Sequence, residues 1–150
     1  MFAVGASRFG IADLETFRQQ APKFQAHELD RLVGSYPEAV ATYRARSPLD
    51  AVDRITRPVL LVHGLEDTVV PPSQAQVMAE ALERRGVRHV LLAFPGEGHG
   101  FHRPESIVRA LEAELSFYVG ALGLSPGKPD APLAADGAIA AGSPDQRLGR

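Results

Sequence analysis

The most constraining feature of the sequence is a continuous apolar run at residues 58–63 (PVLLVH) that ends at Gly64. Such a run is typical of a strand buried on both faces, as in a parallel sheet. Residues 88–94 form a second β-rich run, closed by Pro95 and Gly96. We expect helices after each run, at about 71–85 and 104–119. The alternation of strand, helix, strand and helix predicts an α/β fold with a parallel sheet and crossover helices.

Apolar residues recur at helical spacing in both expected helices. In the first, Pro71 and Pro72 mark the start, Gly86 is a suitable residue after the end, and the inner stripe is Val77, Met78, Ala81 and Leu82. In the second, one face carries Ile107, Leu111, Leu115 and Tyr118.

The flanking regions differ from this pattern. Residues 1–7 are apolar and indicate a buried strand or its end. Residues 13–46 suit two or three short helices, the first with Asp13 as N-cap and the last with Pro37 in its first turn. From residue 125 the chain is rich in Pro, Gly, Ala, Asp and Ser without periodicity. We therefore expect a folded α/β domain at 1–124 and a disordered tail at 125–150.

Composition excludes several classes of function. With 16 basic and 18 acidic residues the net charge is −2, which gives no electrostatic reason to expect nucleic acid or a membrane surface as partner. No segment approaches the roughly 20 apolar residues of a membrane helix, and no signal peptide is visible. The absence of cysteine excludes disulfides and thiolate chemistry and fits a reducing compartment, so we expect a cytoplasmic location.

Two segments follow the predicted strands directly, at 63–72 and 95–101, and each offers one residue suited to acid–base chemistry, Asp67 and His99. In open α/β sheets active sites gather at the carboxyl ends of the strands. A serine hydroxyl is a poor nucleophile and needs a base such as histidine, which a buried carboxylate then orients. Either residue alone is also compatible with an ordinary turn or loop position. Together they predict a catalytic acid, Asp67, and a catalytic base, His99.

Neighbouring residues compete for these roles. Glu66 is an alternative acid, and Glu97 is expected to point to solvent. His63 can support the acid loop or be an ordinary core histidine, and we favour the core interpretation. His102 is expected to face water. The histidines show no recognised metal-ligand spacing, so we expect no metal site and no cofactor.

The runs SPL (47–49), PVLLVHG (58–64), DTVVPP (67–72) and GEGHGF (96–101) resemble the prolyl oligopeptidase family of serine peptidases. The resemblance is greatest to the dipeptidyl and acylaminoacyl peptidase branch, and the opening GASRFGIADL (5–14) is also similar to that branch. It implies that residues 1–124 are a partial α/β-hydrolase domain, the C-terminal part of a peptidase catalytic domain, with Asp67 as the acid and His99 as the base of a Ser-Asp-His triad. It also implies a peptide substrate and, as partners, the rest of that domain and a β-propeller.

The nucleophile is the exception to this resemblance. The chain order nucleophile, acid, histidine requires a Gly-x-Ser-x-Gly elbow before Asp67. Only Ser7, Ser35 and Ser47 precede Asp67, and none fits. We therefore expect a serine upstream of this chain and an isolated chain without peptidase activity. A carboxylesterase-like hydrolase and a non-catalytic truncated product are the alternatives.

Overall fold

The computed structural model describes residues 2–124, which contain a parallel sheet of three strands in the order β1-β2-β3. These are β1 (Gly5–Arg8), β2 (Val59–Gly64) and β3 (His89–Phe94). Residues 59–62 of β2 pair with all four residues of β1, and the whole of β2 pairs with β3. The predicted parallel sheet and α/β class are therefore confirmed. The expected tail at 125–150 lies outside the described residues.

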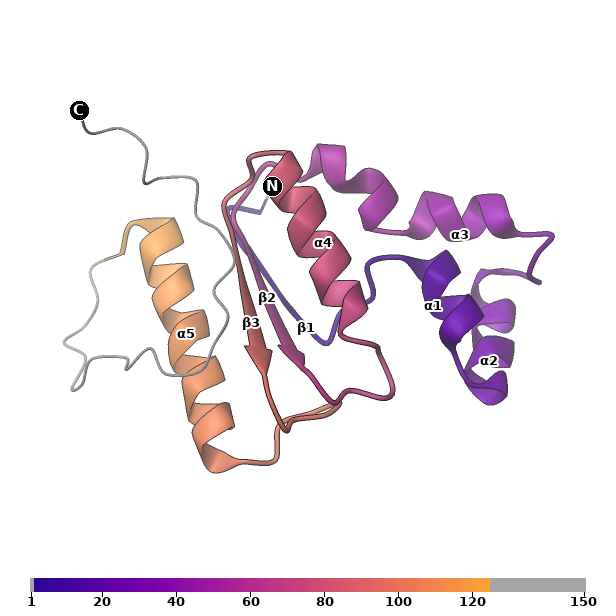
Figure 1. Cartoon of the computed structure of the whole chain (residues 1–150). Helices are drawn as coiled ribbons and strands as arrows, with labels where there is room; N and C mark the ends of the chain where they lie inside the picture. The colour runs from indigo at the N-terminus through magenta and orange to yellow at the C-terminus, as the bar shows by residue number, and fades with distance from the viewer. Residues whose placement is uncertain (1, 125–150) are drawn as a thin grey trace.

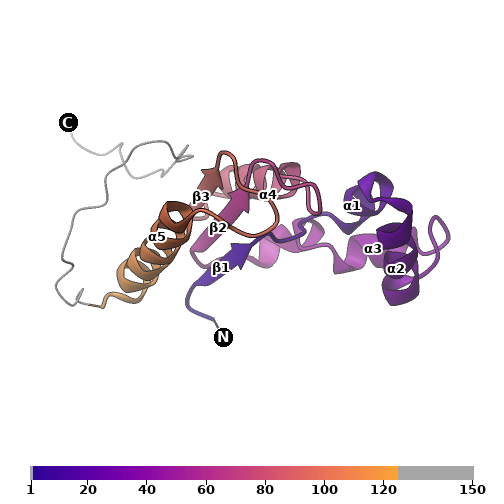
Figure 2. The same ribbon diagram turned by 90° about the horizontal axis from the view of Figure 1, so that it is seen from below.

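Helices cover both faces of the sheet (Figures 1 and 2). One face packs against α5 (Pro104–Leu122), and the other packs against α4 (Ser73–Arg84) and the short 3₁₀ helix η1 (Leu49–Arg54). The buried residues on the α5 side are Leu60, Val62, Leu92, Phe94, Ala110 and Phe117. Those on the α4 side are Ala12, Leu61, Met78, Ala79 and Leu82. Alternate residues of β2 thus serve opposite cores, which explains its uninterrupted apolar sequence.

The long connection from β1 to β2 forms three short helices beside one end of the sheet (Figure 1). They are α1 (Leu14–Gln20), α2 (Lys23–Val33) and α3 (Val40–Arg46). The carboxylate of Asp13 accepts hydrogen bonds from the backbone N–H groups of Glu15 and Thr16, which confirms the predicted N-cap.

The expected position of Pro37 in the first turn of the last helix is wrong. Residues 35–39 form a turn, in which the Ala39 N–H donates to the Ser35 carbonyl at 2.8 Å, and α3 begins only at Val40. Proline fixes φ at a value that suits both turns and the first turn of a helix. Pro37 alone therefore could not distinguish a turn from the start of α3.

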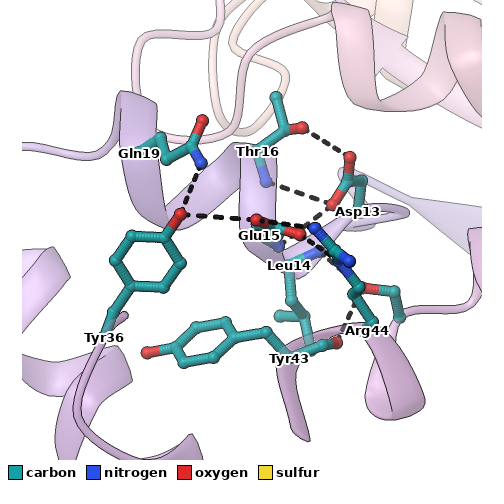
Figure 3. A network of polar contacts seen from close by, with 9 residues as sticks. Asp13, Leu14, Glu15, Thr16, Gln19, Tyr36, Tyr43 and Arg44 are labelled. Carbon is teal, nitrogen blue, oxygen red and sulfur yellow. Dashed lines mark hydrogen bonds and ion pairs between the residues drawn. The ribbon is translucent and has the colours of Figure 1, made fainter. Parts of the chain in front are cut away.

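Polar side chains join α1 to α3 (Figure 3). Arg44 donates from Nε to Glu15 Oε2 at 2.6 Å, and the Tyr36 hydroxyl donates to Glu15 Oε1 at 3.3 Å. Gln19 Nε2 donates to the same hydroxyl at 2.7 Å, while the Tyr36 and Tyr43 rings meet edge to face at 5.7 Å. The helices are too short to be stable alone, so these contacts define their arrangement.

The two large helices differ in how well their sequence pattern predicts burial. In α4, Met78, Ala81 and Leu82 are buried and Val77 is partly buried. In α5 the side that meets the sheet carries small residues and one large ring, namely Ser106, Ala110 and Phe117. The apolar face of Ile107, Leu111 and Leu115 is 40–65% exposed. The helix also runs three residues beyond the predicted end and closes at Gly123, whose φ is +64°.

Candidate active site

Two loops meet where β2 and β3 end, and backbone hydrogen bonds join them. The Leu65 N–H donates to the Phe94 carbonyl at 3.0 Å, and the Glu66 N–H donates to the Glu97 carbonyl at 2.9 Å. A Cβ at Gly64 would lie 2.4 Å from the carbonyl oxygens of Glu97 and Gly98. Only glycine fits this close approach, and it brings the loop of Asp67 against the loop of His99.

Asp67 is buried, and both of its carboxylate oxygens have partners. Oδ1 accepts the backbone N–H groups of Val69 and Val70, each at 2.9 Å. Oδ2 lies 2.9 Å from Nδ1 of His99 and 3.2 Å from Nε2 of His63. Burial alone would raise the pKa of Asp67, but the hydrogen bonds from Val70, His99 and Val69 together outweigh it and hold this pKa below its usual value. The group is therefore a carboxylate at neutral pH.

The orientation of the His99 ring follows from this contact. A carboxylate oxygen can only accept, so Nδ1 of His99 carries the proton and donates. In the neutral ring Nε2 is then the unprotonated nitrogen, the state that a general base needs. The side chain of His99 is 40% exposed while that of Asp67 is fully buried, so an imidazole open to solvent lies against a shielded carboxylate.

His63 is buried, as the favoured core interpretation expected, and it also supports the acid loop. Its side chain is 2% exposed, and Nε2 lies 2.9 Å from the carbonyl oxygen of Val70 and 3.2 Å from Asp67 Oδ2. Both partners are acceptors, so Nε2 carries the proton. The position of His63 at the end of β2, four residues before Asp67, was the available signal.

Glu97 was expected to point to solvent, and this is wrong. The residue is 1% exposed, and its carboxylate accepts the backbone N–H groups of His102 at 2.8 Å and Arg103 at 3.1 Å. The N–H of His102 and the hydroxyl of Ser106 are the main causes that hold the pKa of Glu97 below its usual value. These groups lie at the start of α5, where a negative charge also complements the helix dipole. Glu97 thereby ties the His99 loop to α5.

The other candidates lie apart from this pair. Glu66 is exposed, and the side chain of His102 is 83% exposed, as predicted. His89 is buried with Nδ1 2.9 Å from the carbonyl of Val87. Among residues 2–124 no group of three or more side chains could hold a metal ion.

None of the serines before Asp67 forms a nucleophile elbow. Ser7 lies within β1, and the next helix begins only at Leu14. Ser35 is exposed in the turn before α3, and Ser47 is buried with its hydroxyl bonded to Leu14 N and Tyr43 O. Residues 123–127 (GLSPG) match the letters of the elbow, but they follow a helix instead of a strand and come after His99 in the chain.

Phe9 belongs to the site and was not predicted as a site residue. Its ring centroid lies 5.3 Å from that of His99 and 5.8 Å from that of His63. The only available signal was its place directly after a strand that ends at the same edge of the sheet.

Comparison with known proteins agrees with this architecture. The sequence model of the prolyl oligopeptidase family matches residues 1–125. The chain belongs to this family. The resemblance that the sequence motifs indicated is thereby confirmed.

Peptidases and an esterase are among the proteins that it resembles. A puromycin-hydrolysing peptidase of Mycobacterium tuberculosis has 42% sequence identity and a TM-score of 0.82 over 85% of this chain, which is 19% of that chain. Dipeptidyl peptidase family member 6 of Caenorhabditis elegans is 30% identical over 70% of this chain and 15% of that protein. Esterase LipC of M. tuberculosis is 36% identical over 49% of this chain and 18% of that protein.

Two facts bound what this membership implies. The chain spans less than a fifth of the length of the relatives named above. No helix among the described residues is long and apolar enough to cross a membrane.

Proposed function

We propose that this chain supplies the acid and the base of a serine peptidase active site, with Asp67 as the acid and His99 as the base. The observation that carries the proposal is the 2.9 Å contact between Asp67 Oδ2 and His99 Nδ1 at the joined ends of β2 and β3. Membership of the prolyl oligopeptidase family supports a peptidase over other uses of such a pair. The nucleophilic serine belongs to a segment upstream of this chain.

The chemistry assigned to these residues follows from their protonation. Nε2 of His99 accepts the proton of the serine hydroxyl as that oxygen attacks the peptide carbonyl, and later returns it to the leaving amine. The imidazolium that forms between these steps lies against the Asp67 carboxylate, which stays ionised and stabilises the charge. No cofactor enters this scheme.

The proposal extends to domains and partners. Residues 1–124 form the C-terminal part of an α/β-hydrolase catalytic domain that the upstream segment completes. A β-propeller in the same protein restricts access to the site, and the substrate is a peptide or aminoacyl compound. The peptidase names of two relatives support this choice of substrate.

The decisive experiment uses the DNA upstream of the Met1 codon and the protein that it encodes. We expect an in-frame Gly-x-Ser-x-Gly elbow and aminopeptidase turnover of aminoacyl-anilides by the longer protein. His99→Ala should lower kcat by about 10⁶ and Asp67→Asn by about 10⁴, as in other triad enzymes. The exposed His102 provides the control, because His102→Ala should leave kcat unchanged.

The outcome that contradicts the proposal concerns the 150-residue chain alone. We expect it to show no turnover, so anilide hydrolysis that Ser7→Ala or Ser125→Ala abolishes would place the nucleophile within the chain. An in-frame stop without an elbow would instead favour the non-catalytic alternative.

A carboxylesterase is the second candidate, because Esterase LipC is 36% identical over half of the chain. The same acid and base would serve ester hydrolysis. A panel of p-nitrophenyl esters and aminoacyl-anilides separates the two functions, and turnover of esters alone would favour the esterase.

A further inference from the structure

Phe9 has an unusual backbone for its residue type. Its φ is +53°, and among residues 2–124 it is the one non-glycine residue with positive φ. Bulky side chains rarely adopt this left-handed region, and such residues persist where the surroundings hold them in place. Here the Phe9 N–H donates to the Val62 carbonyl at 3.0 Å, one residue beyond β1, so the ladder with β2 fixes the strained residue.

The ring of Phe9 lies among three other rings. The distance between ring centroids is 5.3 Å to His99, 5.8 Å to His63 and 5.1 Å to Phe101. The corresponding angles between the ring planes are 54°, 65° and 67°. These distances and angles suit tilted and edge-to-face aromatic pairs. Both imidazoles that approach Asp67 Oδ2 therefore also contact Phe9.

His99 needs such a contact more than His63 does. The His99 side chain is 40% exposed, and its only hydrogen bond within residues 2–124 is the one from Nδ1 to Asp67. A single bond leaves an exposed ring free to rotate or to exchange its tautomer. His63, in contrast, is enclosed, with its Nε2 hydrogen-bonded to the Val70 carbonyl and 3.2 Å from Asp67 Oδ2.

We propose that Phe9 is a positioning residue for His99, and that its strained backbone is kept because it turns the ring onto the imidazole. The ring contact favours the orientation in which Nδ1 donates to Asp67 and Nε2 stays unprotonated. Only the description of His99 as a base rests on the proposed function. The orientation itself is a property of this chain and is measurable without activity.

The test is the tautomer of His99, read from ¹⁵N chemical shifts of histidine-labelled full-length chain at a pH where the ring is neutral. The wild-type chain should show the Nδ1–H form. In Phe9→Leu the ratio of Nδ1–H to Nε2–H forms should fall about two- to tenfold, the factor expected for one aromatic pair. Phe9→Tyr keeps the ring and should restore the wild-type ratio. Phe9→Met replaces Phe9→Leu if the latter does not fold.

Phe117→Leu is the matched control, because Phe117 is a buried ring in the second half of α5, whereas the His99 loop precedes the start of that helix. It should leave the His99 ratio unchanged. An unchanged ratio in Phe9→Leu would overturn the proposal, as would an equal fall in Phe117→Leu, which would indicate general loosening.

The positioning role of Phe9 and the proposed peptidase function can fail independently of each other. If Asp67→Asn abolishes the Nδ1–H preference while Phe9→Leu preserves it, the acid–base pair stands and the role of Phe9 falls. If Phe9→Leu lowers the ratio but no longer parent protein hydrolyses peptides, the positioning role stands without the peptidase.

Discussion

At the scale of single residues, Asp67 has more partners than the acid of a catalytic triad would require. Asp67 has two backbone N–H partners on Oδ1 and two imidazoles on Oδ2. A buried carboxylate is costly unless its lone pairs are satisfied, and here every approach to it is occupied. The rotation of the carboxylate is thereby fixed, and His99 meets an acceptor in one defined direction.

His63→Ala tests the second imidazole. It removes the N–H that lies 2.9 Å from the buried Val70 carbonyl and leaves a cavity, so we expect the free energy of unfolding to fall by about 2–4 kcal/mol. Urea denaturation of the full chain measures it. His102→Ala, on an 83% exposed side chain, is the control and should change it by less than about 0.5 kcal/mol. Equal effects of the two variants would contradict a bracing role.

The sequence predicts these residues unequally. Asp67 and His99 could be paired because each directly follows a strand, and adjacent parallel strands end at one edge. The contact of His63 with the acid loop and the burial of Glu97 could not be predicted, because the loops after β2 and β3 bring Val70 back to His63 and the start of α5 back to Glu97. Phe9 is similar, because its importance arises from a backbone angle that no residue pattern encodes.

At the scale of elements, α5 shows that an apolar face is not always the packed face. Ala110 is fully buried, and small residues let the helix approach the sheet closely, while Leu115 is 65% exposed. Helical spacing groups residues on a face, but the neighbouring strands determine which face is covered.

Substitutions on the two faces of α5 should therefore differ. Phe117→Ala should lower the free energy of unfolding by about 3–5 kcal/mol, because it empties a space in the core on the α5 side. Leu115→Gln should change it by less than about 0.5 kcal/mol. Urea titration of both variants measures this contrast, and a large loss in Leu115→Gln would show that the exposed face is covered in solution.

The helices between β1 and β2 depend on an ion pair with a defined pH response. Arg18 donates two hydrogen bonds to Asp30 at 2.7 and 2.9 Å, and the Tyr43 hydroxyl donates a third at 3.0 Å. The bonds from Arg18 are the main cause that lowers the pKa of Asp30 from 3.8 to about 2.

A carboxyl whose pKa is lower in the folded state than in the unfolded state stabilises the fold at any pH above its unfolded-state pKa. This contribution is lost as the pH falls through the folded-state pKa. Wild type should therefore exceed Asp30→Asn in free energy of unfolding at neutral pH, with the difference shrinking between pH 3.8 and about 2. Urea titrations across this range measure it. Glu38→Gln, on an exposed residue, is the control, and a difference that grows on acidification would refute the assignment.

At the scale of the whole molecule, the site exists because the sheet places two loops together. The order β1-β2-β3 puts the three strands side by side (Figure 2). Phe9, Asp67 and His99 follow separate strands and therefore meet at one edge of the sheet. The parallel sheet could be predicted from its apolar runs, and with it the edge where the site lies. The contacts across the loops could not, because they depend on Å-scale backbone approach.

Gly64 is the position where that approach is closest, so the final prediction concerns Gly64→Ala. A Cβ there would lie 2.4 Å from two backbone carbonyls of the His99 loop, and backbone cannot move aside as a side-chain end can. We expect a loss of about 1–3 kcal/mol in free energy of unfolding, as for other overpacked sites. The loops must also separate, so the Nδ1–H preference of His99 should weaken in the same variant.

Gly5→Ala is the matched control, since a Cβ at Gly5 meets nothing within 4 Å. It should preserve both stability and the His99 tautomer. If Gly64→Ala destabilised the chain but left the tautomer intact, the loops would move together, and the pair would depend on its own hydrogen bond more than on the sheet. If both measurements change, the chemistry of Asp67 and His99 is set by how closely β2 and β3 hold their loops.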